Sequence, residues 1–185
     1  MLVYTFFTVY RTKDWKNNFT LIEHDLPYLT ESVNAYRIAA ATYCNEALAE
    51  EMKANYDRTY TDQMIKKAEE YATKGQEIYE PVVELWEIRG LCSFYKKDFR
   101  TALHYFLKCK DTDSNYLGGI NYIGFTYWKL NNIDSAAYYF RYVMEREHFF
   151  GYSANNMVDM LVANNRRNAA DSILYDMKRR NPEDK

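Results

Sequence analysis

The stretch GFTYWKLNNIDSAAYYF, residues 124–140, decides the fold because a similar stretch, GLCSFYKKDFRTALHYF, precedes it at residues 90–106. The glycines that open the two stretches lie 34 positions apart. The same offset separates Ala102 from Ala136 and the two phenylalanines that close the stretches. An offset that several residues share indicates an internal repeat, which governs the interpretation of the whole fold.

Three frames follow when the glycine takes the eighth place of a 34-residue unit: 83–116, 117–150 and 151–184. Apolar residues recur within each frame at spacings of three and four, which is the period of a helix. Turn-forming residues interrupt this pattern in the middle of each frame. Each frame is therefore predicted to be a pair of helices joined by a turn.

The residues of these turns occupy equivalent places in the frames. Lys97, Asn131 and Asn165 share one place, where asparagine tolerates a left-handed backbone. Asp98 and Asn132 share the next place, and both are good N-cap residues for the second helix of the pair. The sequence thus predicts the same turn geometry in successive frames.

The glycine and alanine of the opening stretch are expected to sit where helices meet. Gly124 has no side chain to keep its helix away from a neighbour, and Ala136 has only a small one. Tyr127, Tyr139 and Phe140 are predicted to fill the space between the helices. Because one pair cannot bury its apolar faces alone, successive pairs are expected to stack.

This pattern resembles the tetratricopeptide repeat (TPR) family, whose signature is W-x₂-L-G-x₂-Y…A-x₃-F…P at a 34-residue period. The matching residues are Trp86, Gly90, Ala102 and Phe106 in the first frame, Gly124, Tyr127, Ala136 and Phe140 in the second, and Ala170 and Pro182 in the third. The resemblance covers residues 83–182. It implies an all-α fold, a right-handed superhelical solenoid of antiparallel helix pairs.

Residues 29–82 are predicted to form a divergent helical pair that caps the array. Its first helix is expected over 29–55, with Thr30 as N-cap, and its second over 60–75, ended by Gly75.

Residues 1–28 form an N-terminal segment with the least readable pattern, in which NNF at 17–19 and HDLP at 24–27 suggest loops. Its apolar beginning, 1–13, is a poor signal peptide. It is interpreted as a segment that packs on the first helices, or as the tail of a membrane segment if the natural protein begins upstream. A cytoplasmic location is favoured, and a periplasmic one applies if the natural N-terminus lies upstream.

Composition and motifs argue against most kinds of chemistry. The chain of 185 residues is 48% hydrophobic and 27% charged, which is ordinary for a folded domain. Its three cysteines form no CxxC motif, so neither a disulfide framework nor a metal site is expected, and Cys92 and Cys109 are interpreted as small core residues. No stretch approaches the ~20 apolar residues of a membrane span. No concentrated basic face indicates nucleic-acid binding.

The sequence lacks the GxxxxGK[ST], GxGxxG, GxSxG and HExxH motifs, so no cofactor and no enzymatic activity are predicted. Glu23, His24 and Asp25 are the only tight cluster of acid–base side chains, and they are interpreted as a solvated surface.

The family resemblance implies a protein-interaction module whose first helices line a concave surface. The predicted peptide-binding residues are Tyr95, Asn121, Tyr122, Trp128, Lys129, Tyr152, Asn155, Asn156 and Asp159. Leu91, Phe94 and Phe125 also occupy contact places, where a core role explains Leu91 and Phe125 equally well. In the best-known groove of the family, cationic side chains grip a C-terminal carboxylate. Here Glu87, Gly118 and Tyr152 hold those places, so an apolar or aromatic peptide segment is the expected partner.

Two alternative functions stay open. The stretch DSAAYYF, 134–140, resembles repeats that precede bacterial histidine kinases and transcription regulators, which favours a sensor or regulatory part of a signalling system. An enzyme with an unfamiliar site is the third possibility. The sequence does not reveal the oligomeric state.

Overall fold

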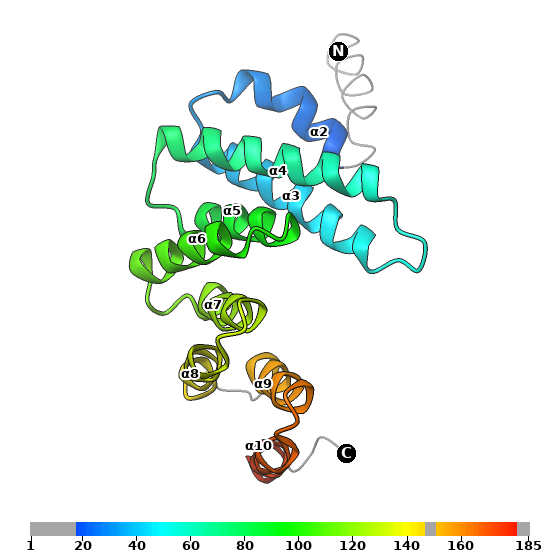
Figure 1. Cartoon of the computed structure of the whole chain (residues 1–185). Coiled ribbons are helices and arrows are strands. Elements are labelled where there is room, and N and C mark those ends of the chain that lie inside the picture. Colours follow the sequence, from blue (N-terminus) through cyan, green and yellow to red (C-terminus); the bar gives the residue numbers. More distant parts are fainter. Residues whose placement is uncertain (1–17, 147–150, 181–185) are drawn as a thin grey trace. The chain divides into compact units, whose positions relative to one another are not determined.

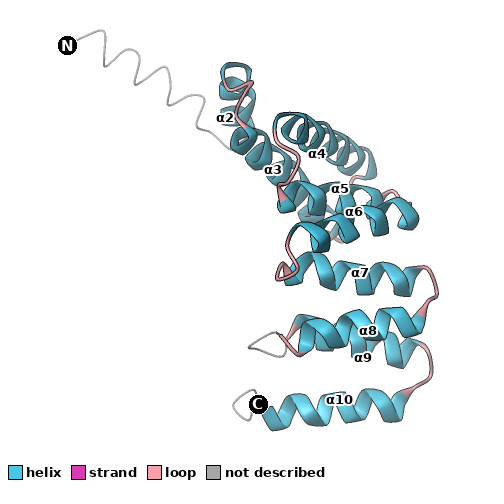
Figure 2. Cartoon of the chain, turned by 90° about the vertical axis from the view of Figure 1, so that its left-hand side faces the viewer, coloured by secondary structure: helices cyan, strands magenta, loops and turns pink. Residues whose placement is uncertain are grey.

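The computed structural model describes residues 18–146 and 151–180, and these residues form helices, turns and loops without a strand (Figures 1 and 2). The elements are α2 (Asn18–Asp25), the 3₁₀ helix η2 (Leu26–Tyr28), α3 (Val33–Glu51), α4 (Arg58–Ile78), α5 (Val83–Tyr95), α6 (Phe99–Thr112), α7 (Leu117–Lys129), α8 (Ile133–Met144), α9 (Tyr152–Ala163) and α10 (Arg167–Arg180). The all-α prediction is confirmed. The apolar beginning of the chain, 1–13, lies outside the described residues.

The chain divides into two compact units, residues 1–92 and 93–185, and the boundary falls inside α5. In the first unit α3 and α4 lie side by side (Figure 1). Small residues make this close packing possible because their short side chains allow the two backbones to approach each other. The fully buried alanines of the two helices are Ala39, Ala40, Ala47, Ala68 and Ala72.

The ends of these two helices differ from the prediction. α3 begins at Val33, and its N-cap is Ser32, whose Oγ accepts a hydrogen bond from the backbone N–H of Ala35 at 3.2 Å. The expectation that Thr30 caps this helix is wrong. α3 ends at Glu51, and α4 begins at Arg58, after the cap residue Asp57.

Gly75 does not end α4, which continues to Ile78. A Cβ at Gly75 would lie 2.9 Å from Cδ1 of Leu85 and 3.2 Å from Cβ of Tyr36. The glycine therefore serves close packing between helices. The expectation that Gly75 ends the helix is wrong, and the reason is that glycine is common both at helix ends and at close helix contacts.

Asn17 lies outside the described residues. For residues 18–19 and 24–27 the expectation of loops is wrong, since α2 contains Phe19 and His24 and η2 begins at Leu26. An ion-pair cluster ties α2 to the two long helices. Nζ of Lys67 lies 2.6 Å from Oε1 of Glu23, and the hydroxyl of the buried Tyr43 donates to the same oxygen at 3.0 Å. The ammonium group also lies 4.9 Å from the centre of the Tyr43 ring. These contacts join α2, α3 and α4.

In the second unit, each helix from α6 to α10 packs against the next one along the chain (Figures 1 and 2). The turns between paired helices confirm the repeat. Lys97, Asn131 and Asn165 have φ values of 61°, 60° and 58°, so all three adopt the predicted left-handed backbone.

The two predicted caps of this unit are confirmed. Oδ1 of Asp98 accepts from the backbone N–H of Thr101 at 3.1 Å, and Oδ1 of Asn132 accepts from that of Ser135 at the same distance. These bonds satisfy N–H groups that have no partner within the helix.

Gly124 marks the tightest helix contact of this unit. A Cβ there would lie 2.8 Å from both Cδ1 and Cε1 of the fully buried Phe140, and 3.3 Å from the carbonyl oxygen of Ala136. The rings of Tyr127 and Tyr139 stack beside this contact with centroids 5.7 Å apart. The predicted roles of these five residues are confirmed. Cys92 and Cys109 are likewise buried, as expected of core residues.

Gly124→Ala is expected to lower the free energy of unfolding by about 1–3 kcal/mol, the usual cost of overpacking. The loss should outweigh the gain of up to about 1 kcal/mol that alanine brings to a helix interior. Gly118→Ala, at an exposed place in the same helix, is the matched control and should be neutral or stabilising. Urea unfolding followed by circular dichroism measures both. Equal midpoints for Gly124→Ala and the wild type would contradict the close contact.

The cluster around Glu23 makes stability depend on pH. The hydrogen bond from Lys67 lowers the pKa of the Glu23 carboxyl below its usual 4.5, and the bond from Tyr43 adds to the effect. Because the pKa is lower in the folded chain, the carboxylate stabilises the fold above the unfolded pKa, and this contribution is lost as pH falls through the folded pKa.

Glu23→Gln is therefore expected to lower the free energy of unfolding at neutral pH by about 0.2–1 kcal/mol, the range for solvent-exposed pairs. The difference from the wild type should vanish in acid, where both side chains are neutral. Urea unfolding at a series of pH values measures it. A difference that stays constant with pH would show that the charge of Glu23 is not responsible.

Candidate peptide-binding face

The predicted contact residues lie mainly on α7 and α9, the first helices of the second and third frames. Leu91 is buried in the first unit, whereas Phe94 and Tyr95 lie at the end of α5, within the second unit. α7 and α9 also touch each other directly. We use the term first-helix face for the surface that α7 and α9 form with Phe94 and Tyr95.

Exposure differs strongly along this face. Tyr152 is 74% exposed, and Lys129, Asn155 and Asp159 are exposed as well. Asn121 is only 7% exposed. The remaining predicted residues, Tyr95, Tyr122, Trp128 and Asn156, are partly buried. The part of the face that is open to a ligand therefore comprises the beginning and middle of α9 and the end of α7.

An aromatic cluster underlies the end of α7. The ring of Phe125 lies 5.5 Å from that of Phe94 and meets that of Trp128 edge-on at 5.4 Å. Nζ of Lys129 lies 5.2 Å from the Phe125 ring and 5.4 Å from the Trp128 ring. These distances are those of cation–π contacts. The cluster offers a rigid apolar surface with one positive charge at its edge.

Two of the predicted amides bind each other. Nδ2 of Asn156 donates to Oδ1 of Asn121 at 3.4 Å, which links α9 to α7. Tyr122 is held in a similar way, since its ring stacks on Phe106 with centroids 5.1 Å apart. Asn155 is the exposed amide on this face, next to Asn156 in the chain.

The acid–base cluster of the N-terminal segment is held by its neighbours. Glu23 bonds to Lys67 and Tyr43, while Nδ1 of His24 lies 2.7 Å from Oδ1 of Asp25. The three side chains therefore do not act on one common point. Within residues 18–146 and 151–180, no group of three or more histidine, cysteine, aspartate or glutamate side chains is placed to hold a metal ion. No helix in these ranges has the length and apolar character needed to cross a bilayer.

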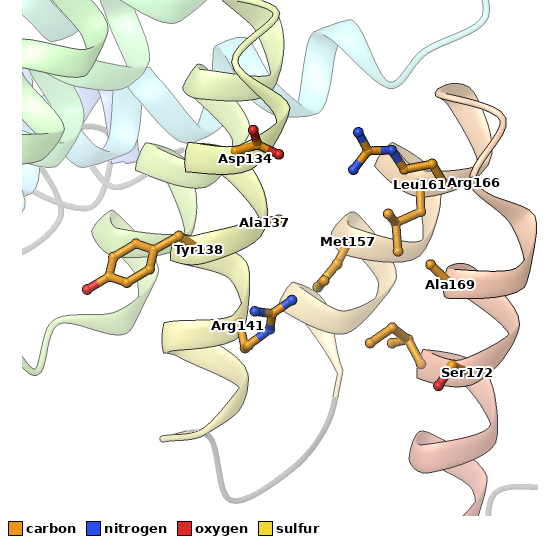
Figure 3. Close-up of a pocket in the computed structure, with 10 residues that line it drawn as sticks. Asp134, Ala137, Tyr138, Arg141, Met157, Leu161, Arg166, Ala169 and Ser172 are labelled. Carbon is orange, nitrogen blue, oxygen red and sulfur yellow. The ribbon is translucent and has the colours of Figure 1, made fainter.

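A pocket of about 440 Å³ between α8, α9 and α10 uses none of the predicted contact residues (Figure 3). It contains Arg141 and Arg166. Sequence reasoning missed both, although the repeat frame held a signal: Arg166 occupies the place that Asp98 and Asn132 hold in the earlier frames.

The fold is similar to that of MamA, a TPR-like helical repeat protein. One crystal structure of MamA matches with a TM-score of 0.69 and 12% sequence identity, over 88% of this chain and 85% of that chain. A second matches with a TM-score of 0.61 and 13% identity, over 88% of each chain. No protein-family model matches the chain, and no curated protein matches it in sequence. The chain has the all-α fold of a TPR-like solenoid, built from helices packed in adjacent pairs.

The pair formed by Asn121 and Asn156 can be tested by a double-mutant cycle. Asn121→Ala and Asn156→Ala are expected to couple by about 0.5–1.5 kcal/mol, because each change leaves the other amide without its partner. Asn121→Ala combined with Asn155→Ala is the matched control, and its coupling should be close to zero. Unfolding free energies of the five variants give both values. Equal coupling in the two cycles would show that the hydrogen bond does not form.

Proposed function

We propose that the chain is a non-enzymatic protein-interaction module that binds an apolar or aromatic peptide segment on the first-helix face. The observation that carries this proposal is the exposure of Tyr152, which stands about three-quarters in solvent at the start of α9 beside the amide of Asn155. Tyr152 and Asn155 stand one turn apart on the same helix, so both side chains can contact one ligand. Large aromatic side chains dominate binding energies at protein interfaces.

The side chains of this face suit an extended peptide. Tyr152 and the partly buried Trp128 offer large contact areas that lose little conformational entropy on binding. The amide of Asn155 can donate to a backbone carbonyl and accept from a backbone N–H. Together these groups would hold a peptide by its main chain and by apolar side chains.

The charges on the face suggest that recognition does not depend on a charged ligand. Lys129 is its exposed cation and Asp159 its exposed anion, so the two nearly balance. The places of the carboxylate clamp on α7 and α9 hold Gly118 and Tyr152, neither of which is cationic. Binding is therefore expected to change little with salt.

The test starts from a random peptide display library selected on the full chain, followed by titration of the enriched peptides. Tyr152→Ala combined with Asn155→Ala should weaken binding of aromatic peptides about tenfold or more, since hot-spot side chains contribute about 2 kcal/mol or more. Both side chains are exposed, so the fold should persist. Tyr175→Ala, 69% exposed on α10, is the matched control and should bind like the wild type.

Unchanged affinity in the double variant would exclude the first-helix face as the site. A steep loss of affinity between low and physiological salt would contradict recognition by apolar contacts.

A further inference from the structure

The pocket between α8, α9 and α10 is lined by residues of all three helices (Figure 3). Its floor is formed by Met157 and Leu161, which are 3% and 5% exposed. Met157 follows Asn155 by two positions, a turn of about 200° in a helix, so the two side chains leave α9 in nearly opposite directions. Ala137 and Ile173 complete the apolar lining from α8 and α10. A cavity of about 440 Å³ falls within the usual size of ligand pockets.

Two guanidinium groups flank this apolar floor. Arg141 extends from α8 and Arg166 from the turn before α10, and both side chains are turned toward the space between the helices (Figure 3). Neither guanidinium makes a hydrogen bond or an ion pair with another residue in the described part of the chain. Asp134 is the one acidic residue of the lining, so the pocket carries a net positive charge.

Arg166 is an unusual residue for the position that precedes the second helix of a frame. Asp98 and Asn132 cap their helices from the equivalent position, with side-chain oxygens that accept backbone N–H groups. An arginine side chain has no acceptor. Arg166 and Arg167 also put two cations at the positive end of the α10 dipole, which is unfavourable. Residues that destabilise their own helix are expected mainly at places where they serve binding.

We propose that this pocket binds an acidic and aliphatic peptide segment of a partner protein. An aliphatic side chain of the segment fills the floor between Met157 and Leu161, and carboxylates on either side of it pair with Arg141 and Arg166. Guanidinium groups match carboxylates in geometry as well as charge. The site is separate from the first-helix face and independent of the function proposed for that face.

Other anionic partners fit the pocket less well. A small inorganic anion would leave the apolar floor empty. An anionic membrane is recognised by clusters of about four to eight lysines and arginines, whereas this pocket has two arginines and an aspartate. A peptide supplies both the apolar group and the carboxylates from one short segment.

The proposal is tested with the random peptide display library, selected on the full chain at low salt. Selection should enrich peptides in which aspartate or glutamate alternates with leucine, isoleucine or methionine. Their affinity, measured by fluorescence anisotropy, should fall about tenfold or more in the Arg141→Gln, Arg166→Gln double variant, and should fall with added salt. Lys178→Gln removes one exposed charge from α10 outside the pocket and should change affinity little.

A second variant separates binding from folding. Arg166→Asp restores a capping side chain at the start of α10, so the thermal unfolding midpoint should rise while the affinity for acidic peptides falls. A loss of binding in a more stable protein excludes unfolding as the cause. The Tyr152→Ala, Asn155→Ala variant should keep its affinity for acidic peptides, which distinguishes this site from the first-helix face.

Several results would overturn the proposal. They are the enrichment of no acidic peptide, an affinity for acidic peptides that survives in the arginine double variant, and binding to phosphatidylserine vesicles that depends on Arg141 and Arg166 without any binding to acidic peptides.

Discussion

The close approach of helices at Gly124 is the constraint on which the second unit depends. The ring of Phe140 occupies the space where any side chain at position 124 would begin, and the backbone of Ala136 lies directly beside it. This contact fixes the spacing within the pair α7–α8, and the core that Phe140 enters continues to Met157 and Ala170. The pair and the next pair are therefore held by one continuous set of buried side chains. The faces left outside this core carry the exposed groups of both proposed sites.

The repeat explains why much of the second unit could be predicted from sequence. A left-handed turn residue and an N-cap depend on local chemistry, so their recurrence at Asn131 and Asn132 was enough to fix a turn. In residues 29–82 the repeat pattern is weak, so no equivalent position separates similar signals there. The sequence around Gly75 is compatible with a helix end and with a close helix contact. The contacts with Leu85 and Tyr36, which come from other helices, show that the second role applies.

The candidate sites were harder to foresee, since exposure depends on neighbours that the frame does not specify. Asn121 and Asn155 occupy equivalent frame places, yet one is buried against α9 and the other stands in solvent. The pocket forms only when α8, α9 and α10 are in place, and only then do Arg141 and Arg166 line one common space. Read singly, each arginine is an ordinary surface residue.

The alanines buried between α3 and α4 have a consequence for the tolerance of this protein to mutation. A core of leucine or phenylalanine can be changed in two directions, because a side chain can be made smaller or exchanged for one of similar volume. At Ala39, Ala40, Ala47, Ala68 and Ala72 nearly every substitution adds atoms to a space that is already closed. These five buried positions of α3 and α4 therefore admit few other residues.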